Sequence, residues 1–162
     1  RTNYPWLSVI FCTDMLRAFA VLKGKGASND SVTLTYEDRF KRRVVLRTDR
    51  GIEFLLDLPT VTDLQHGDLL ELENGALVEV IAAPEDLLEI RGADTRSLVR
   101  LTWHIGNRHL ACMIEDDRLL VRPDHVIQHM IEHLGGRTSL VQEPFMPEGG
   151  AYGRGRTHSH DH

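Results

Sequence analysis

The chain has 162 residues and a mass of 18.4 kDa, enough for one domain or two small ones. Its hydrophobic content of 41% and charged content of 27% are ordinary for a soluble globular protein. The formal net charge of −5 argues against general nucleic-acid binding, which usually requires a basic surface. No apolar run approaches the roughly 18 residues of a transmembrane helix, so we expect no membrane association. The two cysteines, Cys12 and Cys112, lie too far apart for a zinc ribbon or a disulfide framework, and the cytoplasm fits best.

The first fourteen residues differ from the rest of the chain. Their apolar run, Trp6 to Cys12, lacks the basic region and the small-residue cleavage site of a signal peptide. A strand-like pattern begins at Met15-Leu-Arg-Ala. We therefore expect residues 1–14 to be a non-native or upstream extension, with Met15 as the natural start.

Residues 15–84 contain short strand-like runs separated by turn residues. Residues 31–36 alternate between apolar and polar, as a half-buried strand does, and Pro59 is predicted to end the strand that starts at Glu53. Asn74-Gly75 predicts a type I′ hairpin turn, in which both central residues have positive φ. Strands this close together, with no helix between them, predict a small antiparallel β domain, arranged as a sandwich or barrel.

After Pro84 the pattern changes to strand, helix, strand, strand, helix, strand. Asp94 or Thr95 can cap a helix that runs to Gly106, and Gly135-Gly136 can stop a second helix that opens at Pro123. This order predicts a ferredoxin-like βαββαβ domain over residues 85–146, so the fold class is α+β. Residues 147–162 are too rich in glycine to bury a core and are predicted to form a flexible tail.

Histidines are the candidate metal ligands, because imidazole suits zinc, copper and nickel. His104 and His109 lie five residues apart, about 140° around a continuous helix, so a regular helix cannot direct both at one ion. We expect Gly106-Asn107 to end the helix in a left-handed conformation and to leave His109 just beyond its end. A loop histidine that satisfies backbone carbonyls is the alternative interpretation.

Two further groups of histidines lie closer to the C-terminus. His125, His129 and His133 form one stripe on the second helix, for which a solvated face is the favoured interpretation at His129 and His133. Asp124 in the first turn leaves His125 free to act as a ligand. The terminal His158, His160 and His162 alternate with other residues, including Ser159 and Asp161, which favours a natural metal-binding tail over an expression tag.

Catalysis has little support. The sequence has no Gly-x-Ser-x-Gly elbow and no His-Glu-x-x-His, so we predict that the protein is not an enzyme. Two alternatives stay open: a scaffolding module whose histidines are incidental and, ranked below it, a metal-dependent hydrolase that would use Glu115 or Asp116.

Three motifs together resemble the UreE family of urease accessory proteins, over Met15 to His162. They are Gly106-Asn-Arg-His109, Asp124-His-Val126, and Pro144-Phe-Met-Pro-Glu-Gly-Gly-Ala-Tyr152 before a histidine-bearing tail. The resemblance implies a cytoplasmic, homodimeric nickel metallochaperone that works with the urease apoprotein and other urease accessory proteins. It implies that His109 meets its symmetry mate on the dimer axis and shares one Ni²⁺ with it. Some members have a His-x-His where this chain has Pro123-Asp-His125, so one imidazole is missing here.

The predicted metal ligands are therefore His109, His125, His158, His160 and His162. The expected ion is Ni²⁺, with Zn²⁺ or Cu²⁺ as ions that could bind in vitro. Because imidazole does not separate nickel from zinc by ligand type, a zinc carrier is a further alternative.

Overall fold

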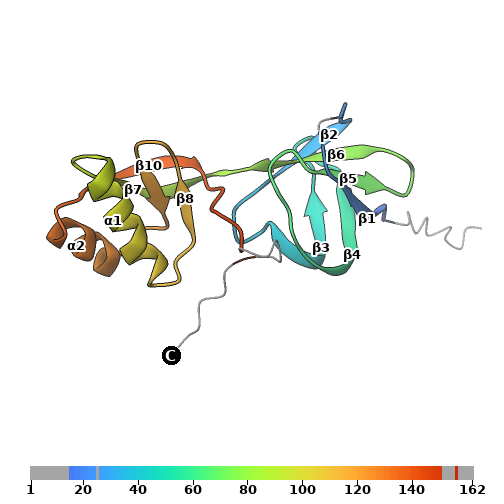
Figure 1. The fold of residues 1–162 in the computed structure, drawn as a ribbon. Helices are drawn as coiled ribbons and strands as arrows, with labels where there is room; N and C mark the ends of the chain where they lie inside the picture. The colour runs from blue at the N-terminus through green and yellow to red at the C-terminus, as the bar shows by residue number, and fades with distance from the viewer. Residues whose placement is uncertain (1–14, 25, 151–155, 157–162) are drawn as a thin grey trace, which may run out of the picture.

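The computed structural model describes residues 15–24, 26–150 and 156, which form two lobes (Figure 1). The first lobe contains β1 (Arg17–Leu22), β2 (Asp30–Leu34), β3 (Phe40–Arg47), β4 (Glu53–Asp63), β5 (Leu69–Leu72) and β6 (Leu77–Ala82). The second contains β7 (Pro84–Arg91), α1 (Thr95–Gly106), β8 (Cys112–Ile114), β9 (Leu119–Val121), α2 (His125–His133) and β10 (Arg137–Pro144). None of the helices in the described ranges is long and apolar enough to cross a membrane.

The first lobe is the predicted β domain, with strand order β2-β6-β5-β1-β4-β3. Two of its strand pairs, β1 with β4 and β2 with β6, are parallel, so the sheet is mixed rather than wholly antiparallel. Each of these pairs joins strands that are not consecutive in the sequence. The intervening chain can therefore bring the second strand back in the same direction as the first. The buried faces of the strands form one apolar core that includes Phe54, Leu56 and Leu70.

Two local predictions in this lobe are wrong. Pro59 does not end a strand, because β4 continues to Asp63. The β3–β4 register jumps from Arg43 opposite Asp57 to Lys41 opposite Thr62, so Pro59 lies where the ladder is interrupted and its missing N–H costs little. At the β5–β6 hairpin only Gly75 has positive φ (82°), and its N–H donates to the Leu72 carbonyl (2.8 Å). The turn is therefore a three-residue loop ending in a left-handed glycine, not type I′.

The second lobe confirms the predicted ferredoxin-like arrangement. Its sheet has the order β10-β7-β9-β8 with every pair antiparallel, and α1 and α2 cover one face (Figure 1). Both helices begin at an aspartate: Asp94 accepts the Ser97 N–H (2.7 Å), and Asp124 accepts the N–H groups of Val126 (2.7 Å) and Ile127 (3.1 Å). Gly135, with φ 86°, follows α2 as predicted.

The two lobes meet at a joint that the chain crosses in extended form between β6 and β7, where Ala83 lies between the strands (Figure 1). Tyr36 of the first lobe and Phe145 of the second pack edge to face, with ring centroids 5.1 Å apart and planes at 70°. The side chain of Arg39, with 1% of its surface exposed, donates from one terminal nitrogen to the Phe145 carbonyl. Its Nε has no partner in the described part of the chain, and burial lowers the pKa of this guanidinium. The joint is therefore packed and hydrogen-bonded.

Candidate metal centre

The end of α1 presents the first predicted ligand, His109. Successive hydrogen bonds from Arg108 N–H to the Ile105 carbonyl (3.0 Å) and from His109 N–H to the Gly106 carbonyl (3.0 Å) tighten the chain after the helix. Asn107 keeps a right-handed conformation, with φ −66°. The left-handed residue is His109 itself, with φ 55°, so the prediction that Gly106-Asn107 would take this conformation is wrong. The chain stays right-handed one residue longer because these two tight turns extend through Arg108.

His109 combines an exposed side chain with an uncommon backbone conformation. Among the described residues other than glycine, it alone has positive φ. A residue with a Cβ in this region carries a steric penalty, and such strain often occurs where a side chain must be aimed for function. The imidazole that follows α1 is therefore accessible to solvent.

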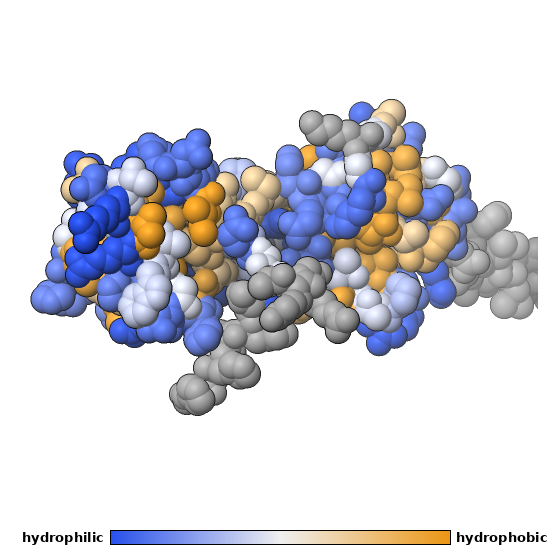
Figure 2. Space-filling view, viewed as in Figure 1, coloured by the Kyte–Doolittle hydropathy of each residue, from blue (hydrophilic) through white to orange (hydrophobic). Residues whose placement is uncertain are grey.

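The outer face of α1, the helix that leads to His109, carries two exposed apolar residues. Leu98, Leu101 and Ile105 are buried against the sheet, whereas the side chains of Val99 and Trp103 are 64% and 65% exposed. Figure 2 shows apolar surface on this lobe in the region of α1 and β8. Trp103 lies on the face of the helix opposite to these buried residues. Val99 and Trp103 therefore leave exposed apolar surface on α1.

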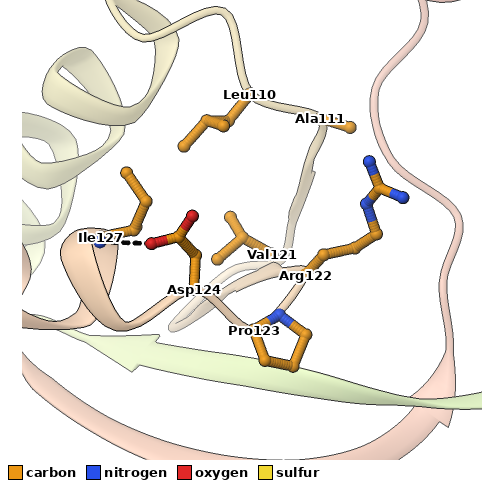
Figure 3. Close-up of a pocket in the computed structure, with 7 residues that line it drawn as sticks. All are labelled: Leu110, Ala111, Val121, Arg122, Pro123, Asp124 and Ile127. Atoms are coloured by element: carbon orange, nitrogen blue, oxygen red, sulfur yellow. Dashed lines mark hydrogen bonds between the residues drawn. The ribbon is translucent and has the colours of Figure 1, made fainter.

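His125, the second predicted ligand, is exposed in the first turn of α2. The carboxylate of the preceding residue, Asp124, accepts the capping hydrogen bonds of α2 and forms no pair with the His125 imidazole. A cavity of about 380 Å³ lies between the segments that carry the two histidines (Figure 3). Its lining residues include Leu110, which follows His109, and Asp124, which precedes His125. Neither histidine is among the residues that line the cavity, so the structure brings their segments together around it.

Other histidines and the described cysteine have different surroundings. His104 is half-buried and packs edge to face on Trp103, with centroids 5.0 Å apart, which is a packing role. His129 and His133 are exposed on α2. Burial raises the pKa of the Cys112 thiol to about 12, so it stays protonated at neutral pH and packs as an apolar group.

Carboxylates of the second lobe are gathered in an ion cluster on the sheet face away from the helices. Glu89 accepts hydrogen bonds from Arg91 (2.9 Å) and Arg118 (2.9 Å), and Arg118 also binds Glu115 and Glu143. The hydrogen bonds from Arg91 and Arg118 lower the pKa of Glu89 to about 2. These carboxylates are neutralised by arginine and are poor candidates for a metal site.

A complete coordination shell is not assembled by one copy of the described chain. Within residues 15–24, 26–150 and 156, no three His, Cys, Asp or Glu side chains lie close enough together to hold a metal ion. The predicted tail ligands His158, His160 and His162 lie outside the described residues.

Comparison with known proteins covers both lobes. The family described as "UreE urease accessory protein, N-terminal domain" matches residues 13–83, and "UreE urease accessory protein, C-terminal domain" matches residues 85–162. A urease accessory protein UreE of Ruegeria pomeroyi is 56% identical over 135 residues, covering 83% of this chain and 89% of the relative. Those of a Chelativorans species and of Rhodobacter capsulatus are each 50% identical, covering 91% of this chain and 91% and 94% of the relatives.

Proposed function

The chain belongs to the UreE family of urease accessory proteins, and on that premise we propose that it is a nickel metallochaperone. It binds Ni²⁺ as cargo and delivers the ion for assembly of the urease active site. It works in the cytoplasm, catalyses no reaction, and docks on the urease apoprotein and other urease accessory proteins. The family gives the role in urease maturation; the nature of the ion and the ligands are our proposal.

The observation that carries the proposal is the placement of His109. Its imidazole is exposed, it follows a strained turn, and it comes after the helix whose outer face carries Val99 and Trp103. A second copy of the chain that covers this face around a two-fold axis would place the two His109 side chains near the axis, since such an interface joins the same patch on both copies. Two imidazoles are suitable donors for Ni²⁺.

The remaining coordination positions would be filled by His158, His160 or His162 of the tail and by water, with His125 as an accessory ligand. A site with few protein ligands that is open to solvent suits transfer, whereas a closed four-ligand cage suits a structural role. A Zn²⁺ carrier would use the same donors, so the experiment compares both ions.

The test is a calorimetric titration with NiCl₂ and ZnCl₂, with the mass of the particle measured by light scattering. His109→Ala should remove a binding step of one Ni²⁺ per dimer while the dimer stays intact. His133→Ala, which changes an exposed histidine at the far end of α2, is the matched control and should leave that step unchanged. Unchanged Ni²⁺ binding in His109→Ala would refute the central role of this residue and favour a scaffold with incidental histidines.

A second variant tests the dimer surface. Trp103→Glu places a charge on the exposed apolar face without altering the buried face of α1, so it should yield monomers. Arg100→Glu, an exposed position on the same helix, is the control for the change in charge. A Trp103→Glu protein that remains dimeric would exclude this face as the interface.

A further inference from the structure

One residue of the tail, Arg156, is held on the first lobe. Its side chain is only 10% exposed. Its guanidinium carbon lies 3.5 Å from the centre of the Tyr36 ring and 4.9 Å from that of Phe40. Its Nε donates to the Asp63 carboxylate (3.1 Å), and a terminal nitrogen donates to the Tyr36 carbonyl. The contact thus joins residues 120 positions apart.

These groups have the chemistry of a site for arginine. A flat guanidinium can stack on aromatic rings while its edge donates to a carboxylate and a carbonyl, which an ammonium on a lysine cannot do at the same time. Asp63 is 20% exposed, so its charge acts on the guanidinium in a partly dry environment. A second carboxylate, Glu37, lies 3.9 Å from another nitrogen of Arg156.

The same tyrosine connects Arg156 with the second lobe. The guanidinium of Arg122 lies 5.8 Å from the Tyr36 ring centre and pairs with Glu37 (2.5 Å). Arg122 also lines the cavity between the segments of His109 and His125 (Figure 3). The point at which the tail is held is therefore one side chain away from this cavity.

We propose that Tyr36, Phe40 and Asp63 form an arginine-binding site that holds Arg156 and thereby shortens the tether between the folded chain and the tail histidines, the proposed Ni²⁺ ligands. The metal part of this inference rests on the proposed function, while the arginine site does not. His158 follows Arg156 by two residues, which span at most about 7 Å. Without the contact, the nearest described residue upstream is Gly150, eight residues before His158.

The difference in tether length gives the expected effect on metal binding. Once a tether is long enough to span its two sites, the effective concentration of the tethered ligand falls roughly as the −3/2 power of tether length, so lengthening from two to eight residues reduces it by about eightfold. Arg156→Ala should therefore weaken the tail-dependent part of Ni²⁺ binding by about five- to tenfold. Arg156 is a positioning residue in this scheme and does not bind the ion.

The arginine site is tested first, without metal, on the ¹⁵N-labelled full chain. Arg156→Ala should shift the amide resonances of Phe40 and Asp63 and lower the heteronuclear NOE of the His158 amide. Arg154→Ala removes the same charge two residues earlier and should change neither. Asp63→Asn should release the tail as Arg156→Ala does. If Arg156→Ala leaves Phe40 and Asp63 unshifted, or if Arg154→Ala shifts them equally, the arginine site is refuted.

The metal part is tested by titrating these variants with NiCl₂. A five- to tenfold loss of affinity in Arg156→Ala, with Arg154→Ala like the parent chain, supports the positioning role. Unchanged affinity in a variant whose tail is released by NMR refutes that role. If the parent chain itself binds no Ni²⁺, the proposed function fails, and the NMR result for the arginine site is unaffected.

Discussion

The left-handed conformation of His109 predicts that glycine is more stabilising than alanine at position 109 but less stabilising than alanine at position 108. With φ 55° at His109, a Cβ is strained, and the cost is about 1–2 kcal/mol for a residue with a side chain. Glycine escapes this cost but loses more freedom on folding, by about 0.5–1 kcal/mol relative to alanine. We expect His109→Gly to be about 0.5–1 kcal/mol more stable than His109→Ala. The lost imidazole contributes little to this difference because it is exposed and absent from both variants.

Arg108 is the matched control. It is exposed, and its φ is not positive. Only the entropy of glycine applies there, so Arg108→Gly should be about 0.5–1 kcal/mol less stable than Arg108→Ala. The double difference between the two positions is then about 1–2 kcal/mol.

The measurement is urea unfolding followed by far-ultraviolet circular dichroism, which reports the helices and strands of both lobes. If glycine is the less stable substitution at His109 as well as at Arg108, the strained conformation is not present in solution and our account of how the imidazole is aimed is wrong.

Two other predictions concern the second lobe. A Cβ at Gly136 would lie 2.6 Å from a methyl group of Ile131, so Gly136→Ala should lower the free energy of unfolding by about 1–3 kcal/mol, measured by thermal melting. Gly149 has open space around it, so Gly149→Ala is the control and should have little effect. Hydrogen bonds from its two arginine partners hold the pKa of Glu89 at about 2 in the folded state, below its ordinary value of 4.5. Its stabilising contribution is thus present above pH 4.5 and lost as the pH falls from 4.5 to 2, so urea midpoints of Glu89→Gln should fall less steeply than those of the parent chain over this range. Parallel curves for the two proteins would contradict the cluster.

The sequence was sufficient for the second lobe because its signals are local. Asp94 marks the start of α1 by capping and Gly135 marks the end of α2, so the order of elements can be read from neighbouring residues. The start of α2 was predicted at Pro123, whereas the helix begins at His125 after its cap Asp124. The first lobe was predicted less well, because the parallel pairing of β1 with β4 depends on contacts between distant strands. Pro59 was misjudged for the same reason, since the interruption that accommodates it is in the pairing with β3.

For the candidate site, the sequence identified His109 as the residue just beyond α1 but not its conformation. The backbone strain depends on how two successive turns close, which residue types alone do not determine. Arg156 was missed altogether, because its partners Tyr36 and Asp63 lie about a hundred residues earlier and a glycine-rich tail carries no pattern that indicates docking. An arginine in such a tail predicts docking only when the aromatic rings that it can stack on, here Tyr36 and Phe40, are already known to be accessible.

The hydrogen bond from Arg39 to the Phe145 carbonyl has a consequence for synthesis of the chain on the ribosome. The acceptor is made 106 residues after the donor. At about 5–20 residues per second, the interval is roughly 5–20 s. The last strand of the first lobe ends at Ala82, 63 residues before Phe145, so for roughly 3–13 s the lobe can fold around Arg39 with the more distant Leu64 carbonyl (3.5 Å) as the acceptor. The first lobe therefore lacks this buried hydrogen bond until β10 and Phe145 are synthesised. That last segment then completes both lobes.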